Sequence, residues 1–239
     1  MSKTIKTDQY GHTTIHIDST AGESATGSSA GEEIDGNAGN DKLYGMAGND
    51  VLVGDNGDDK LYGGTGNDAA WGGGGDDRLY GGEGNDGLVG DAGQDMISGG
   101  KGNDRLWGES GNDRLFGNTG NDAIEGGSGD DTIKGGQGVD TLNGGSGADT
   151  FVWQKGDITK TDGVDHITDW ATGDVLDLTA VLATITSNHD VRVHVTDMAD
   201  GEVVSMQFKK GGAFVDVVML DGAHDLKVAD LLSAHALLV

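Results

Sequence analysis

Hydrophobic residues recur at every ninth position through the middle of the chain, in a background of glycine and polar residues. This spacing runs without insertion from Gly36 to Val152 and defines thirteen units of nine residues. Positions 1 and 4 of every unit are Gly, position 6 is Asp, and position 8 is Leu, Ile or Phe except at Ala70. A disordered linker would not keep a hydrophobic residue and an Asp at fixed places through thirteen units. The pattern therefore predicts a repeat fold.

Each unit divides into a turn and a strand. Glycine allows positive φ, so we predict that the first six residues form a turn in which main-chain carbonyls converge. The last three residues are expected to form a short strand with only its middle side chain pointing inward. Two units make one coil with one strand in each of two facing sheets, and thirteen units give about 6.5 coils. The predicted fold class is all-β, a parallel β-roll with a core one apolar residue wide.

The repeat decays in register on its N-terminal side. Residues 27–35 keep Ile34 at position 8 but have Glu32 at position 6 in place of Asp. Terminal repeats are usually atypical, so this stretch is interpreted as a degenerate capping coil. Residues 13–17 alternate as a strand that would shield a sheet edge. We therefore assign residues 1–35 to an N-terminal strand and a capping coil.

After the repeats, glycine becomes rarer and the apolar runs lengthen. The pattern predicts a short amphipathic helix over residues 225–239. It predicts strands over residues 191–195, 203–208 and 213–220. We assign residues 36–152 to the β-roll and residues 153–239 to a small β-rich cap that ends in the helix and closes the roll.

Charge and composition narrow the possible partners. The 239 residues include 46 Gly and 34 Asp, contain no Cys, and carry a formal net charge of −26. With no basic stripe to neutralise phosphates, nucleic acid is excluded as a partner. The missing cysteines exclude disulfides and thiolate metal sites. No apolar run is long enough for a membrane helix, and the first 18 residues lack the pattern of a cleaved secretory signal.

The acidic residues point to a hard cation. One apolar side chain in nine residues buries too little surface to order the chain, so another stabilising term is needed. Calcium takes 6–8 oxygen ligands, which carboxylates and carbonyls supply. The position-6 Asp residues would stack in two columns, one along each edge of the roll. Neighbouring Asp residues of a column would leave gaps for about eleven calcium ions.

The candidate calcium ligands fall into these two columns. One edge carries Asp41, Asp59, Asp77, Asp95, Asp113, Asp131 and Asp149, and the other edge carries Asp50, Asp68, Asp86, Asp104, Asp122 and Asp140.

The repeats and the segment after them resemble the RTX (repeats-in-toxin) proteins of Gram-negative bacteria. Residues 145–153, 165–170 and 177–178 are similar to the C-terminal target region of type I secreted RTX proteins, as at the C-terminus of large adhesins. The resemblance implies a parallel β-roll with calcium in its turns. It also implies an uncleaved secretion signal at the C-terminus, in agreement with the missing N-terminal signal.

This resemblance implies a function in export. The chain would be unfolded at low cytosolic calcium, pass through a type I secretion system, and fold in extracellular calcium. Its partners would be calcium ions and the ABC transporter, membrane fusion protein and outer-membrane channel of that system. We expect a secreted or cell-surface location and a monomer.

Two other functions remain open. The chain could be an accessory module of a secreted RTX enzyme, such as a protease, lipase or epimerase, although it contains no His-Glu-x-x-His motif and we expect no catalytic residues in it. Alternatively, the surface of the roll could bind a ligand. Tyr44, Tyr62 and Tyr80 would lie on one face, and Trp71 and Trp107 on the other. Packing of these rings in cross-strand ladders is the interpretation that we favour.

Overall fold

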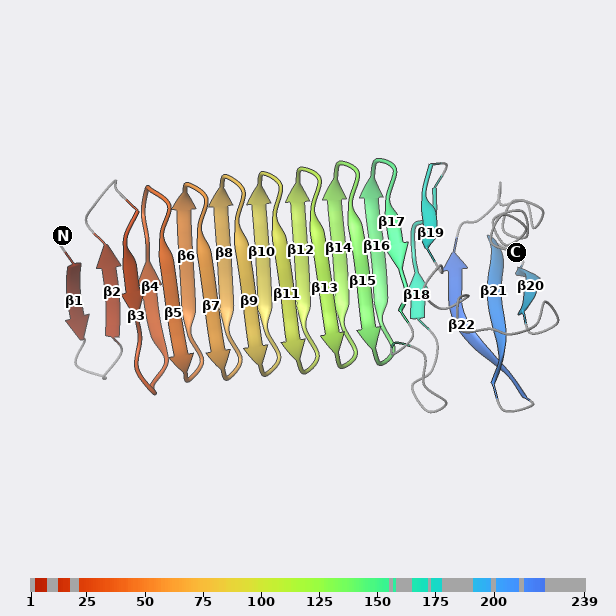
Figure 1. The fold of residues 1–239 in the computed structure, drawn as a ribbon, viewed down its shortest axis with the longest axis horizontal. Helices are drawn as coiled ribbons and strands as arrows, with labels where there is room; N and C mark the ends of the chain where they lie inside the picture. The colour runs from red at the N-terminus through yellow and green to blue at the C-terminus, as the bar shows by residue number, and fades with distance from the viewer. Residues whose placement is uncertain are drawn as a thin grey trace.

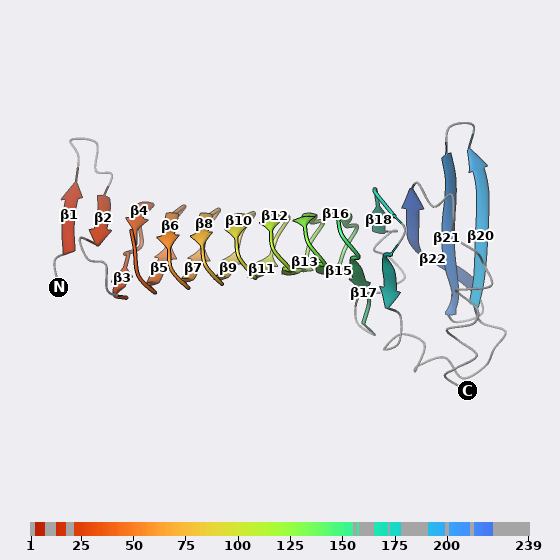
Figure 2. The ribbon, with the colours of Figure 1, turned by 90° about the horizontal axis from the view of Figure 1, so that it is seen from above.

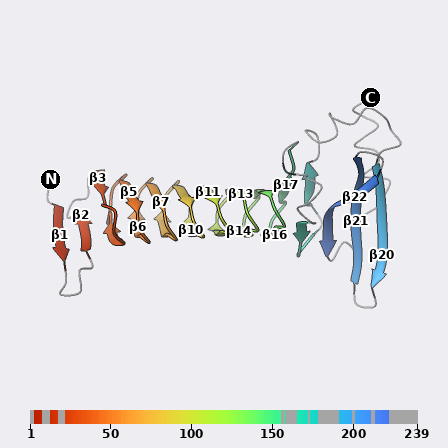
Figure 3. The same cartoon turned by 90° about the horizontal axis from the view of Figure 1, so that it is seen from below.

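The structure is a computed structural model that describes residues 3–7, 13–17, 22–154, 157, 165–171, 173–177, 191–198, 201–210 and 213–221. Its strands stack side by side along one axis into an elongated roll (Figure 1). From β2 to β20, strands that follow one another in the chain alternate between two sheets, which form the two sides of the roll (Figures 2 and 3). The predicted all-β parallel β-roll is confirmed.

The first sheet contains thirteen strands. In spatial order they are β1 (Lys3–Thr7), β2 (Thr13–Ile17), β4 (Glu32–Asp35), β6 (Val51–Asn56), β8 (Ala69–Gly74), β10 (Gly87–Ala92), β12 (Arg105–Ser110), β14 (Ala123–Ser128), β16 (Thr141–Ser146), β18 (Asp165–Ile167), β22 (Ala213–Asp221), β21 (Gly201–Lys210) and β20 (Val191–Met198).

The second sheet contains nine strands. In spatial order they are β19 (Val175–Asp177), β17 (Thr150–Val152), β15 (Thr132–Gln137), β13 (Arg114–Thr119), β11 (Met96–Lys101), β9 (Arg78–Glu83), β7 (Lys60–Thr65), β5 (Lys42–Ala47) and β3 (Ser24–Thr26).

Within the repeats, each full strand is six residues long, so the prediction of three-residue strands is wrong. A strand covers positions 7, 8 and 9 of one unit and continues through positions 1, 2 and 3 of the next. Positions 8 and 1 both point inward, as Leu43 and Gly45 do in β5. The side-chain alternation therefore passes through the glycine, and only positions 4 to 6 remain as the turn.

The core is one ladder of position-8 side chains from each sheet. Leu43, Leu61 and Leu79 lie in register on β5, β7 and β9, and all three are fully buried. Parallel pairing at a constant offset of eighteen residues produces this register through the repeats, as predicted. The ladder extends beyond the repeats through Ala25 of β3 and Ile167 of β18. The thirteen units supply about 6.5 turns, as predicted, and the turns at the two ends bring the roll to about eight.

Positive φ occurs at two positions of the unit. Position 4 is always Gly, and its φ lies between 115° and 145°. Position 2 also has positive φ, although six of its residues are not Gly. These six have φ between 63° and 82°, and they are Asn37, Met46, Asp55, Asp91, Glu109 and Asn118. Position 1 is Gly in every unit for a different reason, which the geometry of the turns explains below.

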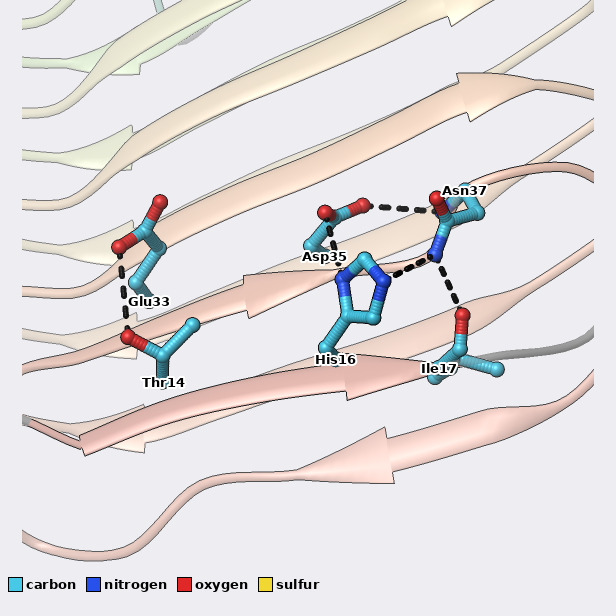
Figure 4. A network of polar contacts seen from close by, with 6 residues as sticks. All are labelled: Thr14, His16, Ile17, Glu33, Asp35 and Asn37. Carbon is cyan, nitrogen blue, oxygen red and sulfur yellow. Dashed lines mark hydrogen bonds and ion pairs between the residues drawn. The ribbon is translucent and has the colours of Figure 1, made fainter. Parts of the chain in front are cut away.

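The N-terminal hairpin covers one end of the first sheet. β1 and β2 pair antiparallel, and β2 pairs parallel with β4 of the capping coil. A polar network joins the two parallel strands (Figure 4). His16 Nδ1 lies 2.8 Å from Asp35 Oδ2, and the Asn37 side chain donates to the Ile17 carbonyl and contacts His16 Nε2 at 3.3 Å. β2 thus lies where a strand was expected, and Ile34 of β4 joins the core ladder.

The coil continues past the last repeat after a seven-residue insertion. β18 pairs with β16, and β19 pairs with β17, both at an offset of twenty-five residues. Beyond them, β22 pairs parallel with β18 and forms an antiparallel sheet with β21 and β20. The three strands expected in the cap are confirmed. The helix expected over residues 225–239 lies outside the described residues. No helix able to span a membrane is found in the part of the chain that the structure describes.

Candidate metal sites in the turns

The position-6 Asp residues form two continuous columns, one along each edge of the roll. The backbone N–H of each Asp donates to Oδ1 of the Asp one coil later, as Asp41 does to Asp59 at 2.7 Å. Eleven such bonds, 2.7–2.9 Å long, join the thirteen predicted ligands within their two columns. The structure therefore brings all the predicted residues together as the repeat predicts.

In twelve of these thirteen residues the second carboxylate oxygen has no hydrogen-bond partner in the structure. All thirteen Asp side chains are buried, with at most 3% of the residue exposed. Buried polar oxygens normally accept a hydrogen bond, and leaving a charged one unpaired is costly. Twelve Oδ2 atoms break this rule: those of Asp41, Asp50, Asp59, Asp68, Asp77, Asp86, Asp95, Asp104, Asp113, Asp122, Asp131 and Asp140.

A main-chain carbonyl oxygen of the next coil lies close to the unpaired Oδ2 atom of the Asp. A Cβ atom built on Gly54 would lie 2.4 Å from Asp59 Oδ2 and 2.5 Å from the Gly72 carbonyl oxygen. Glycine at position 1 is therefore required because a side chain would fill the space where the carboxylate and the carbonyl converge. At Gly45 and Gly81, the corresponding carboxylate and carbonyl oxygens lie within 2.6 Å of the place of a Cβ atom. Anionic carboxylate and neutral carbonyl oxygens are the donors that calcium prefers.

This geometry fits calcium held between neighbouring coils. Nowhere in the described residues do three or more His, Cys, Asp or Glu side chains group around one point. An ion in these turns would therefore be held by the carboxylates of two coils, supplemented by main-chain carbonyls. Such mixed oxygen sets are normal for calcium, whereas zinc prefers nitrogen and sulfur.

Burial raises the pKa of the column carboxyls. The pKa of Asp77, Asp95, Asp131 and Asp140 rises from 3.8 to about 7, and burial is the main cause. The charge of neighbouring column carboxylates adds to the rise at these residues. Backbone hydrogen bonds to the carboxylates oppose it without cancelling it. Without a cation, these carboxyls therefore hold a proton up to a higher pH than an ordinary Asp does.

A second ladder runs beside each column on its exposed side. Position 5 is mostly Asn or Asp, and its side-chain oxygen accepts from the backbone N–H of position 5 one coil later. Asn67 N–H donates to Asn49 at 2.8 Å, and Asp76 N–H donates to Asp58 at 3.1 Å. The sequence showed the preference for Asn and Asp at this position, but its role in joining the turns was not predicted.

Four acidic residues that we did not predict extend the columns. Asp140 N–H donates to Asp165 at 2.9 Å, and Asp149 N–H donates to Asp174 at 3.1 Å. Glu23 and Glu32 take the corresponding places at the N-terminal ends. Asp165 and Asp174 follow the seven-residue insertion, so a nine-residue period continued from the repeats does not reach them. Their separation from each other is nine residues, and this spacing could have revealed them in the sequence.

Protein donors already occupy the carboxylates at several column ends. The Trp153 indole N–H donates to Asp165 Oδ2 at 2.7 Å, and both groups are buried. Ala171 N–H donates to Asp174 Oδ2 at 2.8 Å. At the other end of the roll, the Ser28 N–H and hydroxyl donate to the Glu32 carboxylate. These terminal carboxylates thus differ from the twelve unpaired oxygens between them.

One stretch matches the Gly-x-Ser-x-Gly pattern of a serine nucleophile. It comprises residues 27–31, Gly-Ser-Ser-Ala-Gly. The central Ser29 is exposed in the connection between β3 and β4, whereas the serine of such a motif follows a strand and precedes a helix. The pattern is therefore explained by the turn of the capping coil.

A family model described as the RTX calcium-binding nonapeptide repeat matches the chain in four copies. The matches cover residues 26–61, 53–88, 89–124 and 116–151. Together they span more than half of the 239 residues. They include both Asp columns of the repeats. Among curated protein sequences, none matches the chain significantly.

Two solved structures share low similarity with the chain. The extracellular lipase LipA from Serratia marcescens is 18% identical, with a TM-score of 0.38, over 91% of this chain and 41% of the lipase chain. The AlgE6R3 subunit of the Azotobacter vinelandii mannuronan C5-epimerase is 18% identical, with a TM-score of 0.23, over 87% of this chain and 75% of that subunit. The chain thus spans less than half the length of the lipase.

Proposed function

Because the chain belongs to the RTX calcium-binding nonapeptide repeat family, we propose that it is a calcium-dependent folding and export module of a secreted protein. The observation that supports this most strongly is the set of twelve buried Oδ2 atoms without a partner. Carboxylates buried in columns repel one another, so the roll is destabilised until cations are bound. Binding free energy then becomes folding free energy.

The proposed ions lie between consecutive Asp residues of each column. Six gaps separate Asp41 from Asp149 on one edge, and five separate Asp50 from Asp140 on the other. We propose eleven ions, one for each hydrogen-bonded pair of Asp residues. The terminal carboxylates of Asp165 and Glu32 are not counted, because protein donors already satisfy them.

Calcium-dependent folding suits export through a type I secretion system. At the low calcium of the cytosol the chain would stay unfolded and could pass through the transporter, the membrane fusion protein and the outer-membrane channel. Extracellular calcium would then fold it at the exit and oppose its return. The similarity of residues 145–153 and 165–170 to a type I target region supports this route.

The proposed parent protein is a secreted or cell-surface RTX adhesin. The alternative is a secreted RTX protease, lipase or epimerase in which this chain is the calcium-binding part. In both kinds of protein, the roll would have to fold when it binds calcium. They differ in what precedes the repeats in the complete protein, and the turns of the roll carry the proposed function in either case.

A matched pair of substitutions tests the proposal. Asp77→Asn removes a charge from a column carboxylate, and Asp76→Asn removes the same charge from the neighbouring exposed position, which is Asn in adjacent units. Calcium titrations followed by far-UV circular dichroism should give a higher folding midpoint and about two fewer ions per chain for Asp77→Asn, since each column Asp faces two gaps. Asp76→Asn should behave like the wild type. Equal behaviour of the two variants would contradict the proposed sites.

A further inference from the structure

The two outer faces of the roll carry opposite charge. Outward side chains occupy positions 7, 9 and 2 of each unit. On the sheet of β5 to β15 these positions hold five cations and no carboxylate, and the exposed ion pair of Glu83 with Lys101 lies at the strand ends; we call it the basic face. On the sheet of β4 to β16 they hold six carboxylates and one cation, Arg105; we call it the acidic face. The cations of the basic face are Lys42, Lys60, Arg78, Arg114 and Lys134, and the carboxylates of the acidic face are Glu33, Asp35, Asp55, Asp91, Glu109 and Glu125.

Most of these charges have no partner of opposite sign in the described chain. Lys42 pairs in register with Lys60, and Lys60 pairs with Arg78, so three cations stand in adjacent strands. Among the described residues, these three form no ion pair, whereas Lys134 pairs with Asp157 at 3.4 Å. Like charges on neighbouring strands are destabilising. The row of cations is a basic stripe that was not expected from the sequence, and an anionic partner would stabilise it.

Aromatic and apolar side chains lie among the charges on both faces. On the basic face, Tyr44, Tyr62 and Tyr80 stack with ring centroids 4.9 Å apart and planes within 5°. Their ring faces cover one another, so this column presents ring edges and hydroxyls. On the acidic face, Trp71 is 39% exposed, and a Cβ on the nearby Gly87 would meet nothing within 4 Å. The acidic face thus has an uncovered apolar area beside its carboxylates.

We propose that the calcium-loaded roll associates with further copies of itself, the basic face of one copy lying on the acidic face of the next. The two faces have the same strand spacing and opposite charge, so rows of cations can lie over rows of carboxylates. Six strands of six residues present about 600 Å² per partner, somewhat below a standard interface of about 800 Å². Association is therefore expected to be weak and strengthened by the uncovered Trp71.

The geometry also sets the form of the assembly. The basic and acidic faces lie on opposite sides of the roll (Figure 2). Contact between unlike faces leaves one free face of each kind at the ends, so the assembly is open rather than a closed dimer. This replaces the monomer expected from the sequence. It goes beyond the proposed function, because export requires folding of a single chain only.

Charge reversal on each face tests the proposal by sedimentation velocity of the full chain in saturating calcium. The wild type should show a sedimentation coefficient that rises with protein concentration and falls with added salt. The triple variant Lys42→Glu, Lys60→Glu, Arg78→Glu should stay monomeric, and so should the triple variant Asp55→Lys, Asp91→Lys, Glu109→Lys. An equimolar mixture of the two should associate again, because each face of one is then complementary to a face of the other.

Two controls separate the interface from net charge and from folding. The triple variant Lys6→Glu, Lys209→Glu, Lys210→Glu has the same net charge as the basic-face variant but leaves both faces intact, so it should associate like the wild type. Circular dichroism in calcium checks that each variant is folded. The milder pair Lys60→Ala, Arg78→Ala should weaken association if the reversed chains do not fold.

Three results would overturn the proposal. A wild-type chain that is monomeric at every concentration would exclude self-association. A mixture of the reversed variants that stays monomeric would show that the two faces do not meet. Binding of polygalacturonate to a monomeric wild type, but not to the basic-face variant, would show that the basic face takes an acidic polysaccharide instead of a second copy.

Discussion

At the scale of single residues, the side chain of Asp and the missing side chain of Gly make one site together. Asp59 supplies a buried oxygen with no partner, and Gly54 leaves the space into which that oxygen and a carbonyl point. The sequence predicted the Asp because it is invariant at position 6. It did not predict why position 1 is Gly. It also did not predict the positive φ at position 2, because residues such as Met46 occupy this position and rarely adopt positive φ.

Two glycines three residues apart should respond differently to alanine. Gly84 has a φ of 136°, and a Cβ there would lie 1.7 Å from the Gly66 carbonyl oxygen, whereas a Cβ on Gly87 meets nothing within 4 Å. We expect Gly84→Ala to lower the free energy of unfolding by more than about 2 kcal/mol. Gly87→Ala should raise it by about 0.5 kcal/mol. Denaturant unfolding in saturating calcium measures both. Equal effects would contradict the close contact between the turns.

Protonation should partly replace calcium. The pKa of Asp77 in the metal-free roll is about 7, against 3.8 for an ordinary Asp. Between these values the folded chain holds protons that the unfolded chain has lost, so the stability of the metal-free roll falls as the pH rises through this window. With a chelator present, circular dichroism should show more β-structure at about pH 5.5 than at about pH 7.5. A metal-free chain with more β-structure at the higher pH would contradict the raised pKa values.

At the scale of elements, strand and turn were predictable, whereas their lengths and the ends of the roll were not. Nine-residue periodicity predicted parallel pairing and the Leu ladder, but not that the strand continues through Gly45. The insertion before Asp165 shifts the register by seven residues, and a fixed period cannot follow it. The hydrogen bond from the Trp153 indole to the buried Asp165 carboxylate was not predictable either, because both residues lie outside the repeats.

The bond from Trp153 to Asp165 should stabilise the C-terminal end of the roll. Trp153→Phe keeps an aromatic ring but removes the N–H donor, which leaves a buried carboxylate oxygen unpaired. The loss of stability should be about 1–3 kcal/mol. Trp107→Phe, on the outer face of β12, is the control and should cost clearly less. Thermal unfolding in calcium compares them, and a Trp153→Phe variant as stable as the control would exclude this role.

At the scale of the whole molecule, the roll is a one-dimensional array in which each coil contacts mainly its neighbours. In such arrays folding can begin at any coil and propagate to its neighbours, so the most stable region is favoured as the starting point. The C-terminal sheet of β20 to β22 continues directly from β18, so the coil at Asp149 lies beside the larger of the two caps. We therefore expect folding to start there and proceed toward the N-terminal hairpin. The sequence predicted both caps, but the opposite charges of the two faces became visible only once the register assigned each residue to a face.

The order of folding makes a prediction about export. If the chain leaves its C-terminus first, coils near that end must bind calcium first. Replacing Asp131 and Asp149 by Asn should then reduce secreted protein more than replacing Asp41 and Asp59 by Asn, although both pairs remove two column carboxylates. Secretion yield from a strain carrying a type I system measures the difference. Equal losses from both pairs would contradict folding from the C-terminal end.

The central claim is that calcium supplies the free energy that folds the roll. Its most direct test is far-UV circular dichroism of the wild-type chain, titrated with calcium from a chelated start at neutral pH, with magnesium as the control. We predict a cooperative transition from coil to β-structure that calcium produces and magnesium does not. A full β-signal already present under chelator and unchanged by calcium would contradict the claim, because the narrow ladder of position-8 side chains would then be sufficient to fold the chain.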